Sequence, residues 1–125
     1  MNVVDSGGWL EYFGGGSHAE FFAPAICNLD QLLVPTVCLL EVFKRVLQQR
    51  NESDALQAVA LMQQGTLIEL TADIALMAAR LGQIHKLPLA DSVILASARH
   101  HGAVIWTQDA HFEGIDGVHF IAKLT

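Results

Sequence analysis

The sequence predicts an α/β fold in which a mostly parallel central sheet of four or five strands is flanked by helices. Short, apolar segments of strand length alternate with longer segments in which apolar residues recur every three to four positions. Such alternation is typical of strand–helix–strand units, which build parallel sheets. The chain has 125 residues, which fits a single domain over residues 1–125.

The composition predicts a folded cytoplasmic protein with no membrane segment. Apolar residues make up 52% of the chain and charged residues 16%. No uninterrupted apolar stretch reaches the roughly 18 residues of a membrane span, and no basic region leads into an apolar signal core. We therefore expect the two cysteines, Cys27 and Cys38, to be reduced thiols. The net charge of -6 argues against general electrostatic binding to nucleic acid.

The N-terminal third predicts two strands and a helical turn. Residues 2–4 form a short apolar strand that ends at Asp5, and residues 32–34 form the second strand. Residues 9–13 are expected to form a helical turn that stops at the glycines of positions 14–16. This glycine run lacks the following Lys-Ser or Lys-Thr of a phosphate-binding loop, so we expect a flexible loop there.

After Pro35, Thr36 is the expected N-cap of a helix that extends to about Arg50. Its expected core face is wide and comprises Leu39, Leu40, Val42, Phe43, Val46 and Leu47. Glu41 lies at the edge of that face, on the side shared with Cys38, Arg45 and Gln48.

In the middle of the chain, Ser53 is the expected cap of a helix over residues 55–64, and residues 66–70 form the third strand. Thr71 begins another helix, whose expected core positions are Ile74, Met77, Leu81 and Ile84.

The C-terminal third predicts one more helix and two strands. A helix with many small residues spans 91–98 and ends before Gly102. Residues 103–106 form the fourth strand, and residues 118–121 form a fifth strand at the edge of the sheet.

Four carboxylates lie where apolar segments begin or end: Asp5, Glu41, Asp91 and Asp109. In an open parallel sheet the functional groups collect at the carboxyl ends of the strands, so these acids are expected to converge. Three of them have an ordinary explanation: an ion pair of Glu41 with Arg45, a helix N-terminus for Asp91 and a turn for Asp109. If these ordinary explanations were sufficient, there would be no reason for all four acids to lie at the one edge of the sheet where an active site forms.

Converging carboxylates predict a metal site. Two such charges about 4 Å apart repel each other by roughly 4 kcal/mol at a surface-like dielectric. Four in one cleft imply raised pKa values or bound cations. Oxygen ligands without a thiolate cluster favour Mg²⁺ or Mn²⁺ over zinc.

Four motifs occur in a set order: Val-Val-Asp-Ser at 3–6, Pro-Thr-x-x-Leu-Leu-Glu-Val at 35–42, Leu-Pro-Leu-Ala-Asp-Ser-x-Ile-Leu-Ala at 87–96 and Trp-Thr-Gln-Asp-Ala-His-Phe at 106–112. In this order they resemble a PIN-domain ribonuclease, and the most similar type is the VapC toxin of bacterial toxin-antitoxin pairs. The resemblance covers nearly the entire chain. One departure is that Gly7 and Gly8 stand where the family often has a hydroxyl or β-branched residue, which predicts a looser loop after the first acid.

The resemblance implies a metal-dependent endoribonuclease that cleaves RNA by metal-activated water. The implied metal ligands and catalytic residues are Asp5, Glu41, Asp91 and Asp109, with Ser6 and Thr107 as hydrogen-bonding neighbours. It further implies a homodimer and a cognate antitoxin that covers the acidic site. A structured RNA with a single-stranded loop is the preferred substrate, because unstacked bases can enter a small cleft.

The residues available to bind RNA phosphates near these motifs are Lys44, Arg45, Arg80, Lys86 and Arg99. Among the histidines, His111 has the best claim to a functional role because it is close to Asp109.

Other functions stay open at this point. One is a catalytically idle α/β binding module, and another is a metal-dependent DNA nuclease, because no residue visibly recognises a 2′-hydroxyl. A receiver-like signalling domain also binds Mg²⁺ beside acids, but Asp5 has no acidic neighbour and no lysine follows the late strand at residues 107–109.

Overall fold

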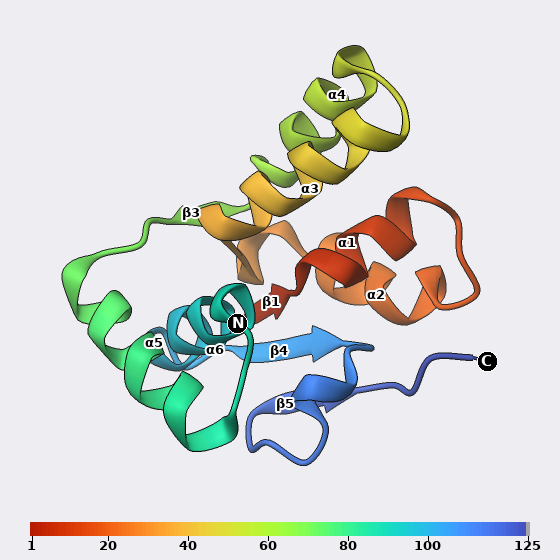
Figure 1. The fold of residues 1–125 in the computed structure, drawn as a ribbon. Helices are drawn as coiled ribbons and strands as arrows, with labels where there is room; N and C mark the ends of the chain where they lie inside the picture. The colour runs from red at the N-terminus through yellow and green to blue at the C-terminus, as the bar shows by residue number, and fades with distance from the viewer. Residues whose placement is uncertain (125) are drawn as a thin grey trace.

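The computed structural model describes residues 1–124, in which five parallel strands form one sheet (Figure 1). The strand order is β3-β2-β1-β4-β5, and every neighbouring pair is parallel. The strands are β1 (Asn2–Val4), β2 (Leu32–Pro35), β3 (Thr66–Ile68), β4 (Val104–Thr107) and β5 (Val118–Phe120). The predicted fold class is therefore confirmed, with the fifth strand at one edge.

Six α-helices and two short 3₁₀ helices connect the strands within the described residues. α5 and α6 pack side by side against one side of the sheet, and α1 and α2 lie on the other (Figure 1). α3 and α4 pack against each other and extend beyond the sheet (Figure 1). The bounds are α1 (Ser6–Phe13), α2 (Ala19–Ile26), η1 (Leu29–Gln31), α3 (Thr36–Gln49), α4 (Glu52–Met62), α5 (Ala72–His85), α6 (Leu89–His100) and η2 (Ala110–Phe112).

The strand order brings the N-terminal strand β1 together with β4, which is about one hundred residues later in the sequence. β2 and β3 are added on one side of β1, whereas the chain then crosses to the other side and adds β4 directly against β1. In this pairing Val4 lies opposite Trp106, and the backbone N–H of Asp5 donates to the carbonyl of Trp106 at 3.2 Å. Residue 5 and residue 107 therefore lie side by side at the carboxyl edge of the sheet.

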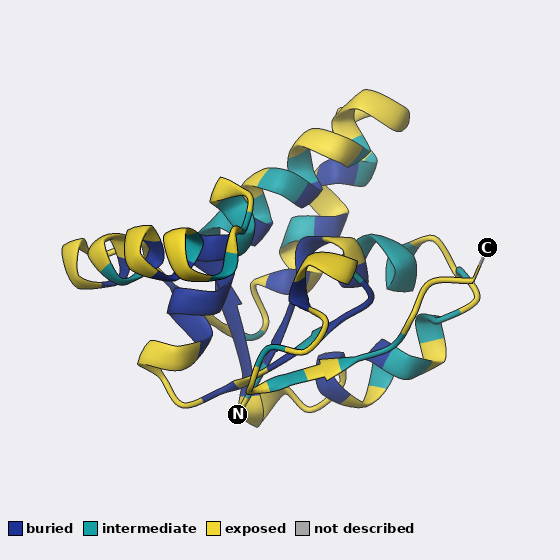
Figure 2. Cartoon of the chain, turned by 60° about the horizontal axis from the view of Figure 1, so that its bottom comes forward, coloured by how far each residue is buried: buried dark blue, intermediate teal, exposed yellow. Residues whose placement is uncertain are grey.

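The core lies on both faces of the central strands, most of whose residues are buried (Figure 2). Its largest fully buried side chains include Trp9, Phe22 and Phe112, which come from three separate helices. No helix within residues 1–124 combines the length and the apolar character needed to cross a lipid bilayer.

Three helices, α1, α4 and α6, begin two or three residues earlier than the sequence pattern predicts. α1 starts at Ser6 because the side chain of Asp5 accepts a hydrogen bond from the N–H of Gly8 and caps the first turn. α4 is capped by Asn51, whose side chain accepts from the N–H of Asp54, so the prediction of a cap at Ser53 is wrong. The predicted starts of α1 and α4 rested on the spacing of apolar residues. In both helices that spacing becomes regular only after the cap and the first turn.

The predicted core face of α3 is too wide. The residues of this helix that are fully buried are Cys38 and Val42, whereas Leu40 is 62% exposed and Leu47 is 44% exposed. Ile84 of α5 is likewise 69% exposed. These apolar stripes are broader than the surface that the sheet and neighbouring helices cover.

Candidate active site

The four acids predicted from the sequence line one cleft of about 470 Å³. Asp5 follows β1, Glu41 lies in α3, Asp91 lies in the first turn of α6 and Asp109 follows β4. Residues separated by more than one hundred positions thus meet at one edge of the sheet.

Asp5 is the most deeply buried of the four, with 4% of its surface exposed. Its Oδ1 accepts from the backbone N–H of Gly8 at 2.7 Å, and its Oδ2 accepts from the Thr107 hydroxyl at 2.6 Å. Burial, with smaller contributions from the charges of Asp109 and Glu41, raises the pKa of Asp5 to about 6 despite these two hydrogen bonds. The site therefore makes the ionised form of Asp5 less favourable unless positive charge is supplied.

Thr107 links two of the acids through one fully buried hydroxyl. It donates to Asp5, and its oxygen accepts from the backbone N–H of Asp109 at 2.9 Å. Ser6 has a similar role at the other side of the cleft, since its hydroxyl donates to Glu41 Oε1 at 2.6 Å. The two predicted hydroxyl neighbours thus contact the predicted acids directly.

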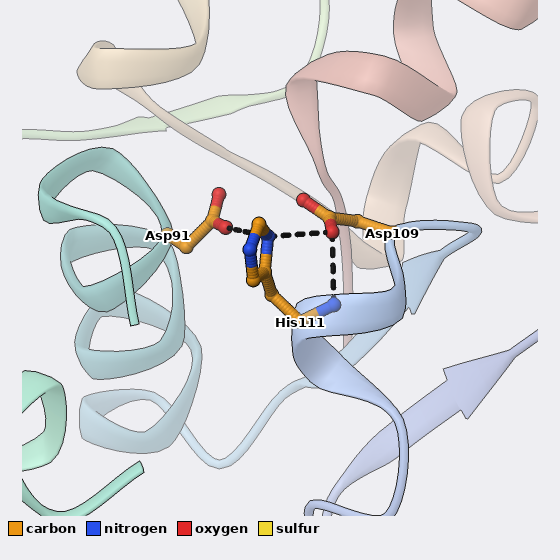
Figure 3. Close-up of side chains that lie close together, drawn as sticks. All are labelled: Asp91, Asp109 and His111. Carbon is orange, nitrogen blue, oxygen red and sulfur yellow. Dashed lines mark hydrogen bonds and ion pairs between the residues drawn. The ribbon is translucent and has the colours of Figure 1, made fainter. Parts of the chain in front are cut away.

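Asp91, Asp109 and His111 form a close group of possible ligands (Figure 3). One ligand atom from each lies within 4.8 Å of the others. His111 Nδ1 is 2.9 Å from Asp109 Oδ1 and 3.4 Å from Asp91 Oδ2, and Asp109 also accepts from the backbone N–H of His111 at 2.9 Å. Because a carboxylate only accepts, this geometry has His111 donating from Nδ1.

The pKa of Asp91 is raised to about 7 by burial and by the charge of Asp109. The charge of His111, when it is protonated, acts in the opposite direction. Two of the four acids, Asp5 and Asp91, thus ionise at a higher pH than usual, which is the behaviour expected of carboxylates that share a site without a cation.

The donor set fits a hard divalent cation. The cleft presents carboxylate oxygens from Asp5, Glu41, Asp91 and Asp109. The nearby thiol of Cys38 is fully buried, donates toward the carbonyl of Val4 at 3.8 Å, and has its pKa raised by burial. A protonated, buried thiol is not a competing ligand, so the possible ligands at the cleft are the carboxylate oxygens and the His111 imidazole, which can hold a divalent cation.

The sequence model of the PIN domain family matches residues 3–118. The chain belongs to the PIN domain family. The resemblance drawn from the four motifs is therefore confirmed. A comparison with curated proteins gave no match.

Solved structures have the same fold as this PIN domain. A chain of a toxin-antitoxin complex from Klebsiella pneumoniae superposes with a TM-score of 0.80 at 25% identity, covering 95% of this chain and 96% of that one. VapC20 from Mycobacterium tuberculosis, a sarcin-ricin loop cleaving toxin, gives 0.78 at 16% identity over 94% and 97% of the two chains. A chain of FitAcB from Neisseria gonorrhoeae gives 0.75 at 15% identity over 96% of each.

Only some of the lysines and arginines predicted to bind RNA phosphates line the cleft of this PIN domain. Lys44 and Arg45 line it, whereas Arg99 donates to the backbone carbonyl of Asp116 at 3.3 Å. Lys123, which follows β5, also lines the cleft and was not predicted. No motif marks Lys123, because its position depends on where β5 pairs with β4.

The PIN domain also corrects the expectation of a loose loop after the first acid. Gly7 and Gly8 both lie in α1, and a Cβ at Gly8 would come within 2.8 Å of a Val4 methyl and 2.7 Å of the Phe22 ring. Gly8 therefore permits close packing of α1 against β1 and α2, and the segment is an ordered helix turn.

Proposed function

We propose that this PIN domain is a metal-dependent endoribonuclease that acts as the toxin of a toxin-antitoxin pair. The observation that carries the proposal is the convergence of four carboxylates in one cleft, two of them with raised pKa values. Family membership and the likeness to toxin-antitoxin complexes support the same function. The proposal treats residues 1–125 as one functional domain.

Asp5, Glu41, Asp91 and Asp109 would hold Mg²⁺ or Mn²⁺ in this proposal. When bound, such an ion lowers the pKa of water and stabilises charge that develops on a phosphodiester. These four acids are thus proposed both as metal ligands and as the catalytic residues.

The neighbouring residues keep the carboxylates in position. Thr107 orients Asp5 by donating to Oδ2, and Ser6 orients Glu41 by donating to Oε1. His111 restrains the carboxylate of Asp109 through its ring and its backbone N–H. Hydrogen bonds of this kind fix ligand geometry before a metal or substrate arrives.

The substrate is proposed to be a structured RNA with a single-stranded loop. Lys44, Arg45 and Lys123 line the acidic cleft and would contact phosphates of the bound strand. A cleft of about 470 Å³ accommodates unstacked nucleotides and not a duplex. Cleavage of the sarcin-ricin loop by VapC20, whose fold is similar, is consistent with such a substrate.

The proposed partners are a cognate antitoxin and a second copy of this chain, in the cytoplasm where the RNA is found. The toxin-antitoxin complex from Klebsiella pneumoniae, one chain of which has this fold, supports assembly with an antitoxin. Large apolar side chains are exposed on three helices, Leu40 in α3, Leu76 in α5 and Leu89 in α6. They provide surface that partners could bury.

The test is cleavage of total cellular RNA by purified, antitoxin-free protein with Mg²⁺, with Mn²⁺ or with EDTA. We expect discrete cuts that require metal and that Asp5→Asn abolishes, whereas Asp30→Asn, at an exposed acid outside the cleft, cuts like the original protein. DNA of the same sequence serves as the competing substrate. Failure of the folded protein to cut RNA under every condition would favour a binding module, and preferential cutting of DNA would favour a DNA nuclease.

A further inference from the structure

A second cavity of about 380 Å³ adjoins the acidic cleft. The two share Gln108 and Lys123 in their walls. The rest of the second cavity is formed by the loop between α1 and α2, including Gly16, Ser17 and His18, and by the segment after β5. In Figure 1 the chain after β5 extends toward the side of the molecule where this loop lies.

Gln108 is held in a defined orientation between the two cavities. Its neighbours in sequence are Thr107 and Asp109, which hydrogen-bond to each other within the acidic site. Gln108 is 9% exposed, and its Oε1 accepts from His18 Nδ1 at 3.0 Å. Since the carbonyl oxygen is engaged, the amide Nε2 is the group that remains available, and it makes no hydrogen bond within residues 1–124.

The loop that carries His18 is fixed by its own contacts, contrary to the expectation of a flexible glycine loop. The Glu11 carboxylate accepts from the backbone N–H of His18 at 2.9 Å, and the Glu11 carbonyl accepts from the N–H of Gly16 at 3.0 Å. Gly15 adopts a φ of 63°, and a Cβ at Gly16 would collide with the Glu11 carboxylate. The glycines thus allow the loop to fold back over Glu11 and form a wall.

We propose that this second cavity binds the nucleotide next to the scissile phosphate and that Gln108 contacts its base. The inference rests on the proposed nuclease function and deepens it. The Gln108 amide would donate to an acceptor on the base edge, His18 would hold that amide in place, and Lys123 would contact the phosphate between the two cavities. A base can present its edge there only when it is unpaired, which links the subsite to single-stranded RNA.

A purely structural role for the Gln108–His18 hydrogen bond predicts a different result. If the bond only tethered the loop, its loss would weaken stability or the overall rate without changing which sequences are cut. A subsite predicts that the base preference beside the cut changes. The choice of base is therefore the decisive measurement.

The experiment uses a labelled library of single-stranded RNA oligonucleotides with randomised sequence, cut in Mg²⁺ or Mn²⁺ and sequenced. For the original protein we expect a preference at one position adjoining the cut. Gln108→Met, which keeps the volume and removes the amide, should flatten that preference and lower kcat/KM for the preferred sequence by about tenfold, as expected for loss of one hydrogen bond. Gln83→Met makes the same exchange on the exposed surface of α5 and should leave the preference intact.

Two further variants separate the contributions of orientation and folding. His18→Ala should also flatten the preference, whereas His18→Asn, which offers an N–H donor near the position of Nδ1, should largely restore it. In an Asp5→Asn background, where cutting is removed, fluorescence anisotropy with the preferred RNA should show weaker binding for Gln108→Met.

The outcomes distinguish the two proposals. If the original protein cuts no RNA, the proposed nuclease function fails and the subsite fails with it. If the original protein cuts with a base preference that folded Gln108→Met retains in full, the subsite alone is overturned. The subsite is likewise overturned if the original protein cuts without any preference at the adjoining positions.

Discussion

Thr107 connects the carboxylate of one strand end to the backbone of the next through a single hydroxyl. Its proton goes to Asp5 and its lone pair accepts from the N–H of Asp109. A valine would match its shape but could make neither bond. Thr107 therefore holds both Asp5 and Asp109 in position.

Thr107→Val should destabilise the protein by about 1 to 3 kcal/mol, because it leaves two buried polar groups without a partner. Urea denaturation measures this change. Thr66→Val is the matched control at an exposed position of β3, and it should alter the free energy of unfolding by less than about 0.5 kcal/mol. Equal effects of the two variants would contradict the role assigned to Thr107.

The four acids could be identified from the sequence because each lies where an apolar segment begins or ends. His111 received only a weak indication, from its closeness to Asp109 in sequence. Gln108 could not be identified, because its importance comes from His18, which is 90 positions away along the chain. Contacts of that kind depend on the complete fold and leave no local pattern.

At the scale of elements, the first turn of α1 combines a cap, a close contact and part of the cleft. Asp5 caps the helix while it lines the active site, and Gly8 supplies both the capping N–H and the space for Phe22. The position of Asp5 is therefore coupled to how closely α1 packs on the sheet.

Gly8→Ala should destabilise the protein by about 1 to 3 kcal/mol, because the added methyl meets Val4 and Phe22 in a packed core. Gly7→Ala provides the control, since its Cβ would find only the Asp5 carboxylate, at 3.8 Å. That change should stabilise the helix by up to about 1 kcal/mol. Thermal unfolding of both variants gives the comparison, and a Gly8→Ala protein as stable as Gly7→Ala would contradict the packing argument.

Most element types and their order were predictable because the apolar segments alternate regularly. The helix α2, which contains Pro24, was not predicted, and neither were some helix starts and exposed faces. The start of α4 depends on Asn51, a polar residue outside the apolar pattern. Leu40 is exposed where it lines the acidic cleft, and periodicity does not encode the position of a cleft.

At the scale of the whole molecule, a net charge of -6 coexists with a cleft that is proposed to bind RNA. Four of the thirteen acidic residues line the cleft where a cation is expected, together with Lys44, Arg45 and Lys123. Metal binding and stability should therefore be linked.

Without divalent metal, the free energy of unfolding should decrease as the pH rises from about 4 to 7. Asp5 and Asp91 have pKa values of about 6 and about 7 in the folded protein, above the usual 3.8, so the folded state retains protons that the unfolded state has lost. For Asp5 alone the loss between pH 5 and pH 8 should be about 1 to 2 kcal/mol.

Urea denaturation at pH 5 and pH 8, in EDTA and in Mg²⁺, tests this expectation. Mg²⁺ should reduce the loss and raise the melting temperature at pH 8, because it binds the ionised acids of the folded state. Asp5→Asn should show a smaller dependence on pH in EDTA. An identical dependence in the two proteins would contradict the pKa assignment.

The position of β4 between β1 and β5 has a consequence for synthesis of the chain. β1 is made first, yet one of its edges stays open until residues 104–107 emerge and pair with it. Asp5 gains its partner Thr107 only at that moment, and Asp109 follows two residues later. A nascent chain therefore cannot assemble the four acids before residue 109 has been translated, so the order of synthesis itself delays any activity that needs all four of them.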